Sequence, residues 1–415
     1  MRKILILIVC LVSLFMVSCK KEYKGSKNES VDEKLENINA QLTYADLQLN
    51  GLLDLAKNKN KNPRTIEPDS SIYFINSDKF DWTEGFFPGS CWYLYEGTRI
   101  EKWKKAASHF QELFKNHKDW PQYHDLGFVF NCSYGNGYRI TQDTTYKKVL
   151  LDAAKTLATR FDTKIGVIKS WDVDKGWQAD RGWQYPVIID NMMNLELLFN
   201  ASIMSGNDDY KNIAISHADK TLKNHFRSNY SSYHVVDYDS ISGQVLSKET
   251  AQGYSDESSW ARGQAWGLYG FTLCYRYTKD EAYLNQAKKI ANLILTSDAI
   301  PSDRIPYWDY DVDEKEHAPR DVSAAAITVS ALIELNTYTN GDYENITNEI
   351  LNVLSSEKYR AKIGENKHFL LKHSVGSIPH NSEIDVPLNY ADYYYLEALI
   401  RAKKYYSTNT NPLKN

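Results

Sequence analysis

The sequence contains few cysteines and none of the common motifs for nucleotides or metal ions. Cys10 and Cys19 lie near the N-terminus, and only Cys91, Cys132 and Cys274 lie in the rest of the chain. Their spacing fits no zinc site, and an odd number cannot all pair internally, so we expect them to be small buried hydrophobic residues. The HExxH helix, the P-loop and the dinucleotide-binding glycine motif are missing as well. The motifs therefore give no case for a zinc, nucleotide or dinucleotide site.

An excess of positive charge is also lacking. The chain has 49 Lys and Arg against 53 Asp and Glu, for a formal net charge of -4. A general nucleic-acid binder would normally carry a basic stripe, so nucleic acid is not an expected partner. With 42% hydrophobic and 25% charged residues the chain is globular. Aromatic residues are abundant at 13%; they either pack in a large core, which composition alone favours, or stack on sugar faces.

The N-terminus has the pattern of an export signal. Two basic residues precede an apolar stretch over residues 4–17, which is too short for a comfortable transmembrane helix. Ser18 and Cys19 follow at once, an order that resembles a bacterial lipoprotein signal. Cleavage of a signal peptide of residues 1–18 would leave Cys19 as a lipidated first residue, followed by a polar tether over residues 19–30. We expect an exported, membrane-anchored protein of the periplasm or cell surface; ordinary secretion, with Cys19 incidental, is the alternative.

Helical periodicity dominates the rest of the chain, and convincing alternating strands are scarce. No Pro-rich or Ser-rich linker divides residues 31–415, which are expected to form one domain. The pattern predicts twelve helices, near residues 30–57, 85–97, 101–117, 124–134, 143–161, 185–205, 208–226, 257–278, 280–296, 320–340, 342–356 and 387–405.

The predicted helices are of two kinds. Residues 281–295 form an amphipathic helix with lysines on one face, whereas residues 186–205 and 322–335 carry almost no charge. A helix that is apolar all round is buried on both sides. Alternation of the two kinds suggests an inner and an outer ring, and six hairpins would make an all-α (α/α)6 barrel with its site at one end. A superhelical repeat array is the alternative, but the sequence has no fixed period.

Asp190 is a charged residue in the apolar stretch of residues 186–194. An ionised and unpaired carboxylate there would be costly, so desolvation should raise its pKa and keep it protonated near neutrality. That is the profile of a general acid. From this segment alone, a structural aspartate that is hydrogen-bonded to a neighbouring helix is equally compatible.

Four other residues are candidates. Asp125 precedes Leu-Gly-Phe at a helix start, where an aspartate is more often a cap than a catalyst. Arg262 and Trp266 share one helix face; a guanidinium suits a carboxylate and an indole suits a sugar face. The alternative for this pair is a salt-bridged core arginine beside a packing tryptophan. His234 lies in a loop-like region, and a lone histidine is usually just a satisfied polar group.

Taken together, these stretches resemble the unsaturated glucuronyl hydrolases, glycoside hydrolase family 88. The matching motifs follow the family's order over most of the chain and occupy residues 82–89, 124–128, 189–195, 260–267, 321–326 and 383–393. One such motif would be a weak signal, but six in order are specific. The resemblance implies an (α/α)6 barrel that acts on lyase-made oligosaccharides. Those carry a 4,5-unsaturated uronic acid at the non-reducing end.

The resemblance also implies the chemistry. The family's reaction begins by hydrating the vinyl-ether double bond, unlike displacement at the anomeric carbon. Asp190 matches the acid/base, which would protonate C4 and help water add at C5; the hemiketal then opens and releases the rest of the chain. Asp125 matches a second carboxylate that holds sugar hydroxyls, a role we adopt over that of a cap. The substrate-contacting positions correspond to His234, Gln252, Arg262 and Trp266, the tryptophan by stacking. No metal or organic cofactor is implied.

Departures and rival interpretations remain. Ser374 and Ser377 are similar to those of members that accept sulfated amino sugars, but Pro379 stands where a basic residue is expected. One rival keeps the barrel and makes the protein an unsaturated rhamnogalacturonyl hydrolase. Another is a non-catalytic outer-membrane glycan-binding lipoprotein, which would need exposed aromatic residues but no buried acid.

Overall fold

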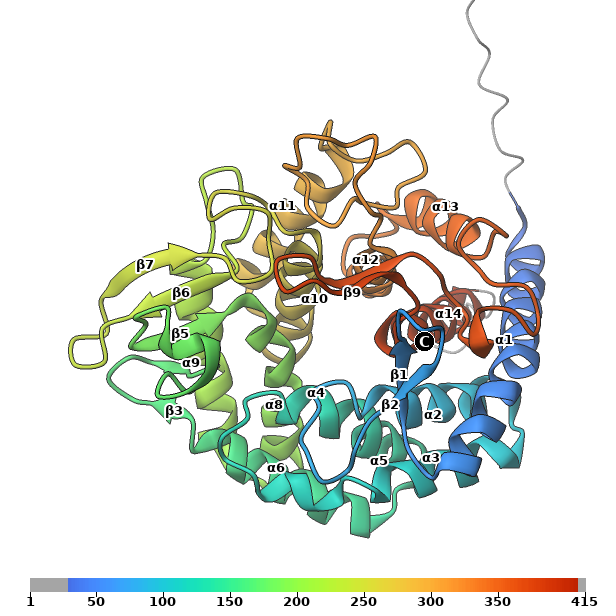
Figure 1. Cartoon of the computed structure of the whole chain (residues 1–415), viewed down its shortest axis with the longest axis horizontal. Coiled ribbons are helices and arrows are strands. Elements are labelled where there is room, and N and C mark those ends of the chain that lie inside the picture. The colour runs from blue at the N-terminus through green and yellow to red at the C-terminus, as the bar shows by residue number, and fades with distance from the viewer. Residues whose placement is uncertain (1–28, 410–415) are drawn as a thin grey trace, which may run out of the picture.

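The computed structural model describes residues 29–409 (Figure 1). The predicted signal peptide, Cys19 and all of the tether except its last two residues lie outside this range. Ser30 begins the first helix, α1 (Val31–Lys59): its hydroxyl accepts the Glu33 N–H, and the Glu33 carboxylate accepts the Ser30 N–H. This reciprocal pair is a capping box and fixes where the helix starts.

Six amphipathic helices form the outside of the molecule. Where Asp or Asn precedes them, as at Asp143, Asn207 and Asp280, the side chain accepts a backbone N–H of the first turn. The outer helices are α1, α3 (Glu101–Glu112), α6 (Thr144–Ala158), α9 (Asp208–Asn224), α11 (Glu281–Thr296) and α13 (Glu344–Leu354).

Six helical segments line the inside, and several of them are buried all round. Each packs against the next, and the last packs against the first, so that the inner ring closes (Figure 1). The predicted (α/α)6 barrel is therefore confirmed. The inner segments are α2 (Phe86–Thr98), the broken helix α4–η2–α5 (Leu126–Phe130, Asn131–Gly135, Asn136–Thr141), η3–α8 (Ile189–Asn194, Leu195–Ser205), α10 (Ala261–Thr278), α12 (Val322–Asn336) and α14 (Asn389–Asn409).

The loops that connect the helices contain short strands and helical turns. The antiparallel strands are β1 (Pro63–Ile66) with β2 (Ile72–Phe74), β3 (Phe161–Asp162) with β4 (Val167–Ile168), β5 (Tyr185–Ile188) with β6 (Val235–Tyr238) and β7 (Val245–Glu249), and β8 (Ser374–Ser377) with β9 (Ser382–Val386). Three short helical turns complete the described chain: η1 (Lys115–Asp119), α7 (Gly176–Ala179) and η4 (Asn366–His368).

The prediction of a helix from residue 185 is wrong at its start. Residues 185–188 form strand β5, in which Val187 faces Val236 and Ile188 faces Val235. Branched side chains favour the extended backbone, and Pro186 is tolerated because β5 is an edge strand that needs no N–H there. The chain turns helical only at Ile189, so the polar residue that follows stands at the entrance of an inner helix.

Aromatic rings fill the centre of the barrel. Trp266 packs edge-on against Phe128 and Tyr394, with ring centroids 5.1 and 5.4 Å apart. The three cysteines of the described chain are free and buried, as predicted. Between residues 29 and 409, no helix combines the length and the apolar character that a membrane span requires.

Candidate active site

Side chains from four separate segments meet where the inner helices begin. Asp125 immediately precedes α4, Asp190 is the second residue of η3, Arg262 is the second residue of α10, and His234 precedes β6. Asp190 Oδ2 lies 3.6 Å from His234 Nε2. The charges of Arg262 and Asp190 act on each other, as do those of Asp190 and Asp125. The fold thus brings four predicted residues to one end of the barrel.

Asp190 is buried without a partner for one of its oxygens. The residue is 9% exposed, and Oδ2 has no hydrogen-bond partner among the described residues. Burial raises the pKa of Asp190 to about 6, against the opposing positive charge of Arg262. A carboxyl group with this pKa holds its proton in mildly acidic solution and can give it up at neutral pH, which suits a general acid.

His234 is held as a neutral hydrogen-bond donor beside Asp190. Its Nδ1 accepts the backbone N–H groups of Ala251 (3.0 Å) and Gln252 (3.2 Å). Nδ1 therefore carries no proton, and the neutral ring has its hydrogen on Nε2, the atom nearest Asp190. Burial, and then the positive charge of Arg262, lowers the pKa of His234 well below its usual range. Gln252 is connected to the site through this bond, and its side chain is half-buried.

Asp125 occupies a cap position but makes no capping bond. It directly precedes α4, yet its side chain accepts no N–H of the first turn. One oxygen lies 3.1 Å from His124 Nε2, and the carboxyl is not used as a cap. Burial, and then the charge of Asp190, raises the pKa of Asp125 well above its usual range. Gly127 lets the start of α4 lie close against the end of η3, because a Cβ at this position would be 2.2 Å from the Asn194 Cα. Asn194 itself bonds the backbone N–H of Phe128 at 3.1 Å.

Arg262 has the contacts of a salt-bridged core arginine. The side chain is buried, with Nη1 3.1 Å from Asp321 Oδ2. Its terminal nitrogens also donate to the carbonyl oxygens of Val375 and Gly376, which ties hairpin β8–β9 to the barrel. The carboxylate partner of Arg262 is thus Asp321, and the arginine acts on Asp190 through its charge.

The predicted stacking role of Trp266 is wrong. Its side chain is 0% exposed, and the rings of Phe128 and Tyr394 pack against it, so it has no face free for a sugar. Its Nε1–H lies near enough to Asp190 to lower the pKa of that carboxyl, although the geometry falls short of a hydrogen bond. Trp266 therefore forms part of the floor beneath the acid.

Sequence reasoning missed the tryptophans that do reach the mouth. Trp171 and Trp183 stack with ring centroids 5.6 Å apart, and Trp177 packs edge-on against both. Trp171 lies 6.0 Å from His234, and Trp177 is 37% exposed. The signal was available: three tryptophans at intervals of six residues in a Gly-rich and Asp-rich stretch lack the spacing of a packed helix.

Hairpin β8–β9 meets this tryptophan segment at the mouth. The His380 ring lies 5.2 Å from the Trp177 ring, and His380 Nδ1 is 2.7 Å from Ser377 Oγ. Ser374 is fully buried, and its hydroxyl has no hydrogen-bond partner within the described range. Within residues 29–409, no group of three or more His, Cys, Asp or Glu side chains is arranged to hold a metal ion.

Known proteins of one family resemble this chain over most of its length. The profile of Glycosyl Hydrolase Family 88 matches residues 56–405. An unsaturated glucuronyl hydrolase of Formosa agariphila is 43% identical over 97% of this chain and 98% of its own length. An unsaturated chondroitin disaccharide hydrolase of Streptococcus agalactiae is 35% identical over 81% of this chain and 84% of its own. The crystal structure of an unsaturated glucuronyl hydrolase specific for heparin is 45% identical and superposes with a TM-score of 0.84, covering 92% of this chain and all of that one.

Proposed function

The chain belongs to glycosyl hydrolase family 88, and we propose how its site performs the reaction. The protein is a glycosidase that releases the 4,5-unsaturated uronic acid from the non-reducing end of lyase-generated oligosaccharides. The observation that carries the proposed mechanism is Asp190, a buried carboxyl with one unpaired oxygen and a pKa of about 6. It stands beside a second carboxyl and a neutral histidine at the mouth of the barrel.

The first step is proton transfer to carbon. In the unsaturated ring, C4 is the electron-rich end of the double bond because the ring oxygen on C5 donates electron density. The Asp190 carboxyl gives its proton to C4, the C4=C5 electron pair forms the new C–H bond, and positive charge develops on C5 and the ring oxygen. Asp190 is left as a carboxylate, which the Nε2–H of His234 and the charge of Arg262 stabilise.

The second step is addition of water. A water molecule attacks C5, and the Asp190 carboxylate takes one of its protons, which restores the acid. The product is a hemiketal at C5, which opens to a ketone as the ring oxygen leaves and gains a proton. C1 then carries a free hydroxyl beside the old glycosidic oxygen, and collapse of this hemiacetal releases the remaining sugar as an alcohol. One water is consumed and no bond at C1 is attacked directly, unlike in ordinary glycoside hydrolysis.

The neighbouring residues position the substrate. Asp125, which makes no capping bond, is available to hold ring hydroxyls. Trp171 offers a partly exposed ring beside His234, so we assign it the stacking that the buried Trp266 cannot perform. Gln252, held next to His234 by its backbone, is the remaining polar side chain that we assign to substrate contact.

The decisive experiment follows the double bond. Unsaturated disaccharides made by lyases from heparin, chondroitin and ulvan are incubated with the protein, and loss of ultraviolet absorbance reports hydration. Asp190→Asn should abolish the loss, whereas Asp143→Asn, the same change at an exposed helix cap, should leave it intact. No loss with any disaccharide would reject the proposal. Hydrolysis of a galacturonyl-rhamnose substrate alone would point to the rhamnogalacturonyl alternative, and polysaccharide binding without product to the glycan-binding one.

We also propose that the mature protein is a lipoprotein that begins at Cys19. The support is the order of charged, apolar and Ser-Cys segments in the sequence. In a bacterial host, full-length protein should fractionate with membranes and carry the mass of a lipid-modified chain that begins at Cys19. Cys19→Ala should lose that mass signature, either by release from the membrane or by keeping residues 1–18. Cys10→Ala, a change inside the apolar segment, is the control and should still be anchored. A wild-type protein without the lipid mass on Cys19, or a Cys19→Ala protein that is cleaved after residue 18 and still anchored, would reject lipidation at Cys19.

A further inference from the structure

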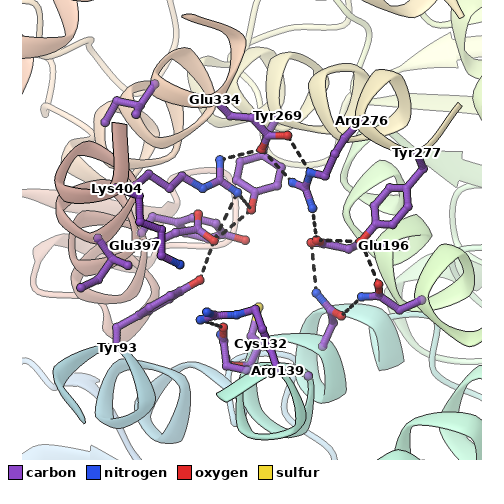
Figure 2. Close-up of a pocket in the computed structure, with 18 of the residues that line it drawn as sticks. Tyr93, Cys132, Arg139, Glu196, Tyr269, Arg276, Tyr277, Glu334, Glu397 and Lys404 are labelled. Carbon is purple, nitrogen blue, oxygen red and sulfur yellow. Dashed lines mark hydrogen bonds and ion pairs between the residues drawn. The ribbon is translucent and has the colours of Figure 1, made fainter. Parts of the chain in front are cut away.

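A large cavity lies at the end of the barrel opposite the active site. Its volume is about 1030 Å³, and side chains from all six inner segments line it (Figure 2). Ile203 and Met204 come from the end of α8, Tyr277 from the end of α10, and Thr408 from the end of α14. The catalytic candidates lie at the other ends of these inner helices, so this cavity is a separate space.

A ring of charged side chains surrounds the cavity and connects one inner helix to the next. Arg276 of α10 donates to Glu196 of α8 and makes two bonds, of 2.6 and 2.7 Å, to Glu334 of α12. Arg401 of α14 continues the ring, 3.1 Å from Glu334 and 3.4 Å from Glu397. Figure 2 shows Arg276 between Glu196 and Glu334, with Glu397 across the open centre from Glu196.

The ring closes through the other two inner segments, α2 and the broken helix α4–η2–α5. Glu397 accepts the Tyr93 hydroxyl of α2 at 2.7 Å. Glu96, also of α2, pairs with Arg139 of α5 at 2.6 Å and with Lys404 of α14 at 2.8 Å. Asn131 of η2 donates to Glu196 of α8 at 3.0 Å, which returns the circuit to its beginning.

The ring balances its own charge. Its four cations and four carboxylates are all paired: Arg139, Arg276, Arg401 and Lys404 with Glu96, Glu196, Glu334 and Glu397. Burial alone would raise the pKa of Glu334, but Arg276 and Arg401 lower it to about 2, so this carboxylate stays ionised. An ionic ligand would bring a net charge to a ring that is already neutral and would compete with these pairs for their partners. A neutral ligand avoids that cost.

The groups that face the space suit hydroxyl-rich molecules. The carboxylates and the amides of Asn131 and Asn200 are bonded to one another, but each of their oxygens has a second lone pair that can accept a sugar hydroxyl. The Tyr138 hydroxyl lines the cavity and makes no hydrogen bond within the described chain. The volume is at the upper end of the roughly 300–1,000 Å³ of ligand pockets. We propose that this cavity is a second, non-catalytic binding site for a neutral saccharide of one to three sugar units.

The aromatic floor of the active site separates the two spaces. Phe128 and Tyr394 line the rear cavity, and Trp266 packs between them on the side of Asp190. A saccharide in the rear cavity therefore cannot reach the acid, and its binding is independent of hydrolysis. Saccharide binding in the rear cavity can therefore be disproved without affecting the proposed hydrolysis at Asp190, and hydrolysis can be disproved without affecting the binding.

The test uses full-length protein and the neutral disaccharides cellobiose, lactose and maltose. Each is titrated and followed by saturation-transfer NMR and calorimetry. Ile203, which is 71% exposed on the last turn of α8, lines the mouth and makes no polar contact, so Ile203→Trp narrows the entrance without breaking the ring. We expect it to weaken binding of at least one disaccharide by at least about tenfold with unchanged kcat/KM.

Two controls fix the location. Ile241→Trp makes the same change at an exposed isoleucine of the β6–β7 hairpin and should leave binding unaltered. In Asp190→Asn, saturating unsaturated disaccharide should not displace the neutral probe. The proposal is overturned by no saturable binding of any of the three probes, by equal affinity in the two tryptophan variants, or by displacement with the unsaturated disaccharide. The first of these results would make the cavity a water-filled space.

Discussion

Asp190→Asn should make the protein more stable at neutral pH while removing its activity. In the folded protein the pKa of Asp190 is about 6, raised from an ordinary value of 3.8 by burial. A raised pKa means that the folded state favours the proton: the associated stability is complete below pH 3.8 and is lost as the pH rises through 6. The difference corresponds to about 3 kcal/mol. Asparagine carries no such cost because it never ionises.

The measurement compares free energies of unfolding at two pH values. Denaturant unfolding of wild type and Asp190→Asn at pH 4 and pH 8 gives the change caused by the substitution at each pH. The substitution should be more favourable at pH 8 than at pH 4 by about 2.5 kcal/mol, because a small part of the ionisation cost is already present at pH 4. In the same proteins, kcat/KM should fall about 10²–10⁴-fold, the usual contribution of a positioned acid or base.

Asp143→Asn provides a control of opposite sign. Its exposed carboxylate accepts the Thr145 hydroxyl and N–H, and these bonds lower the pKa of Asp143. That carboxylate contributes stability at high pH that is lost as the pH falls, so its removal should be less favourable at pH 8 than at pH 4. If Asp190→Asn instead follows Asp143→Asn, or shows no difference between the two pH values, Asp190 is not a buried acid with a raised pKa and the proposed proton donor is lost.

Further predictions concern the residues around the acid. In a pH profile, kcat/KM should fall about tenfold per pH unit above pH 7, because the protonated form of Asp190 reacts. If kcat/KM instead rises as the pH increases through 6, the ionised carboxylate is the reacting form and Asp190 is not the proton donor of the first step. His234→Ala should lower kcat/KM about 10–100-fold by removing the Nε2–H donor, and unchanged kinetics would reject that role. Arg262→Met should cost about 3–5 kcal/mol in urea unfolding because Asp321 is then buried without its counter-charge; a loss below 1 kcal/mol would contradict this. Trp266→Ala should move the falling limb of the pH profile to lower pH, because water entering from the rear cavity hydrates Asp190. Trp266→Phe should keep the aromatic floor closed and move the limb to higher pH, because it removes only the Nε1–H. Equal profiles for the two variants would contradict the separating role of the floor.

The helical architecture could be predicted because the number and placement of charged residues along a helix indicate whether it is buried. Residues 322–335 carry almost no charge, and the structure buries α12 nearly all round. Residues 281–295 form a helix with one apolar face and one face that carries lysines, and this helix, α11, lies on the outside of the barrel. Strand β5 could not be predicted in this way, because residues 185–188 extend the apolar run of the next helix. Their extended backbone depends on pairing with β6, some fifty residues along the chain, which no local pattern reports.

The site was predictable in its ionisable groups and less so in its aromatic ones. A charge in an apolar stretch such as Asp190 must have a raised pKa wherever the stretch is buried, so its unusual state follows from composition. Whether a tryptophan is exposed depends on tertiary packing: Trp266 is enclosed by Phe128 and Tyr394, whereas Trp177 is left at the mouth. The empty capping bond of Asp125 is likewise a matter of side-chain geometry, since the sequence only places an aspartate at a helix start.

The two ends of the barrel treat buried carboxylates in opposite ways, and this contrast identifies the reactive one. At the rear, Glu334 is buried but surrounded by Arg276 and Arg401, so it stays ionised and cannot donate a proton. At the front, Asp190 is influenced by the charge of Arg262, but the ion-pair partner of that arginine is Asp321. One oxygen of Asp190 has no hydrogen-bond partner among the described residues. Reactivity therefore requires that the rear charges and their water stay away from Asp190. The wall around Trp266 supplies that separation, which explains why a tryptophan without any contact to solvent is found directly beneath the acid.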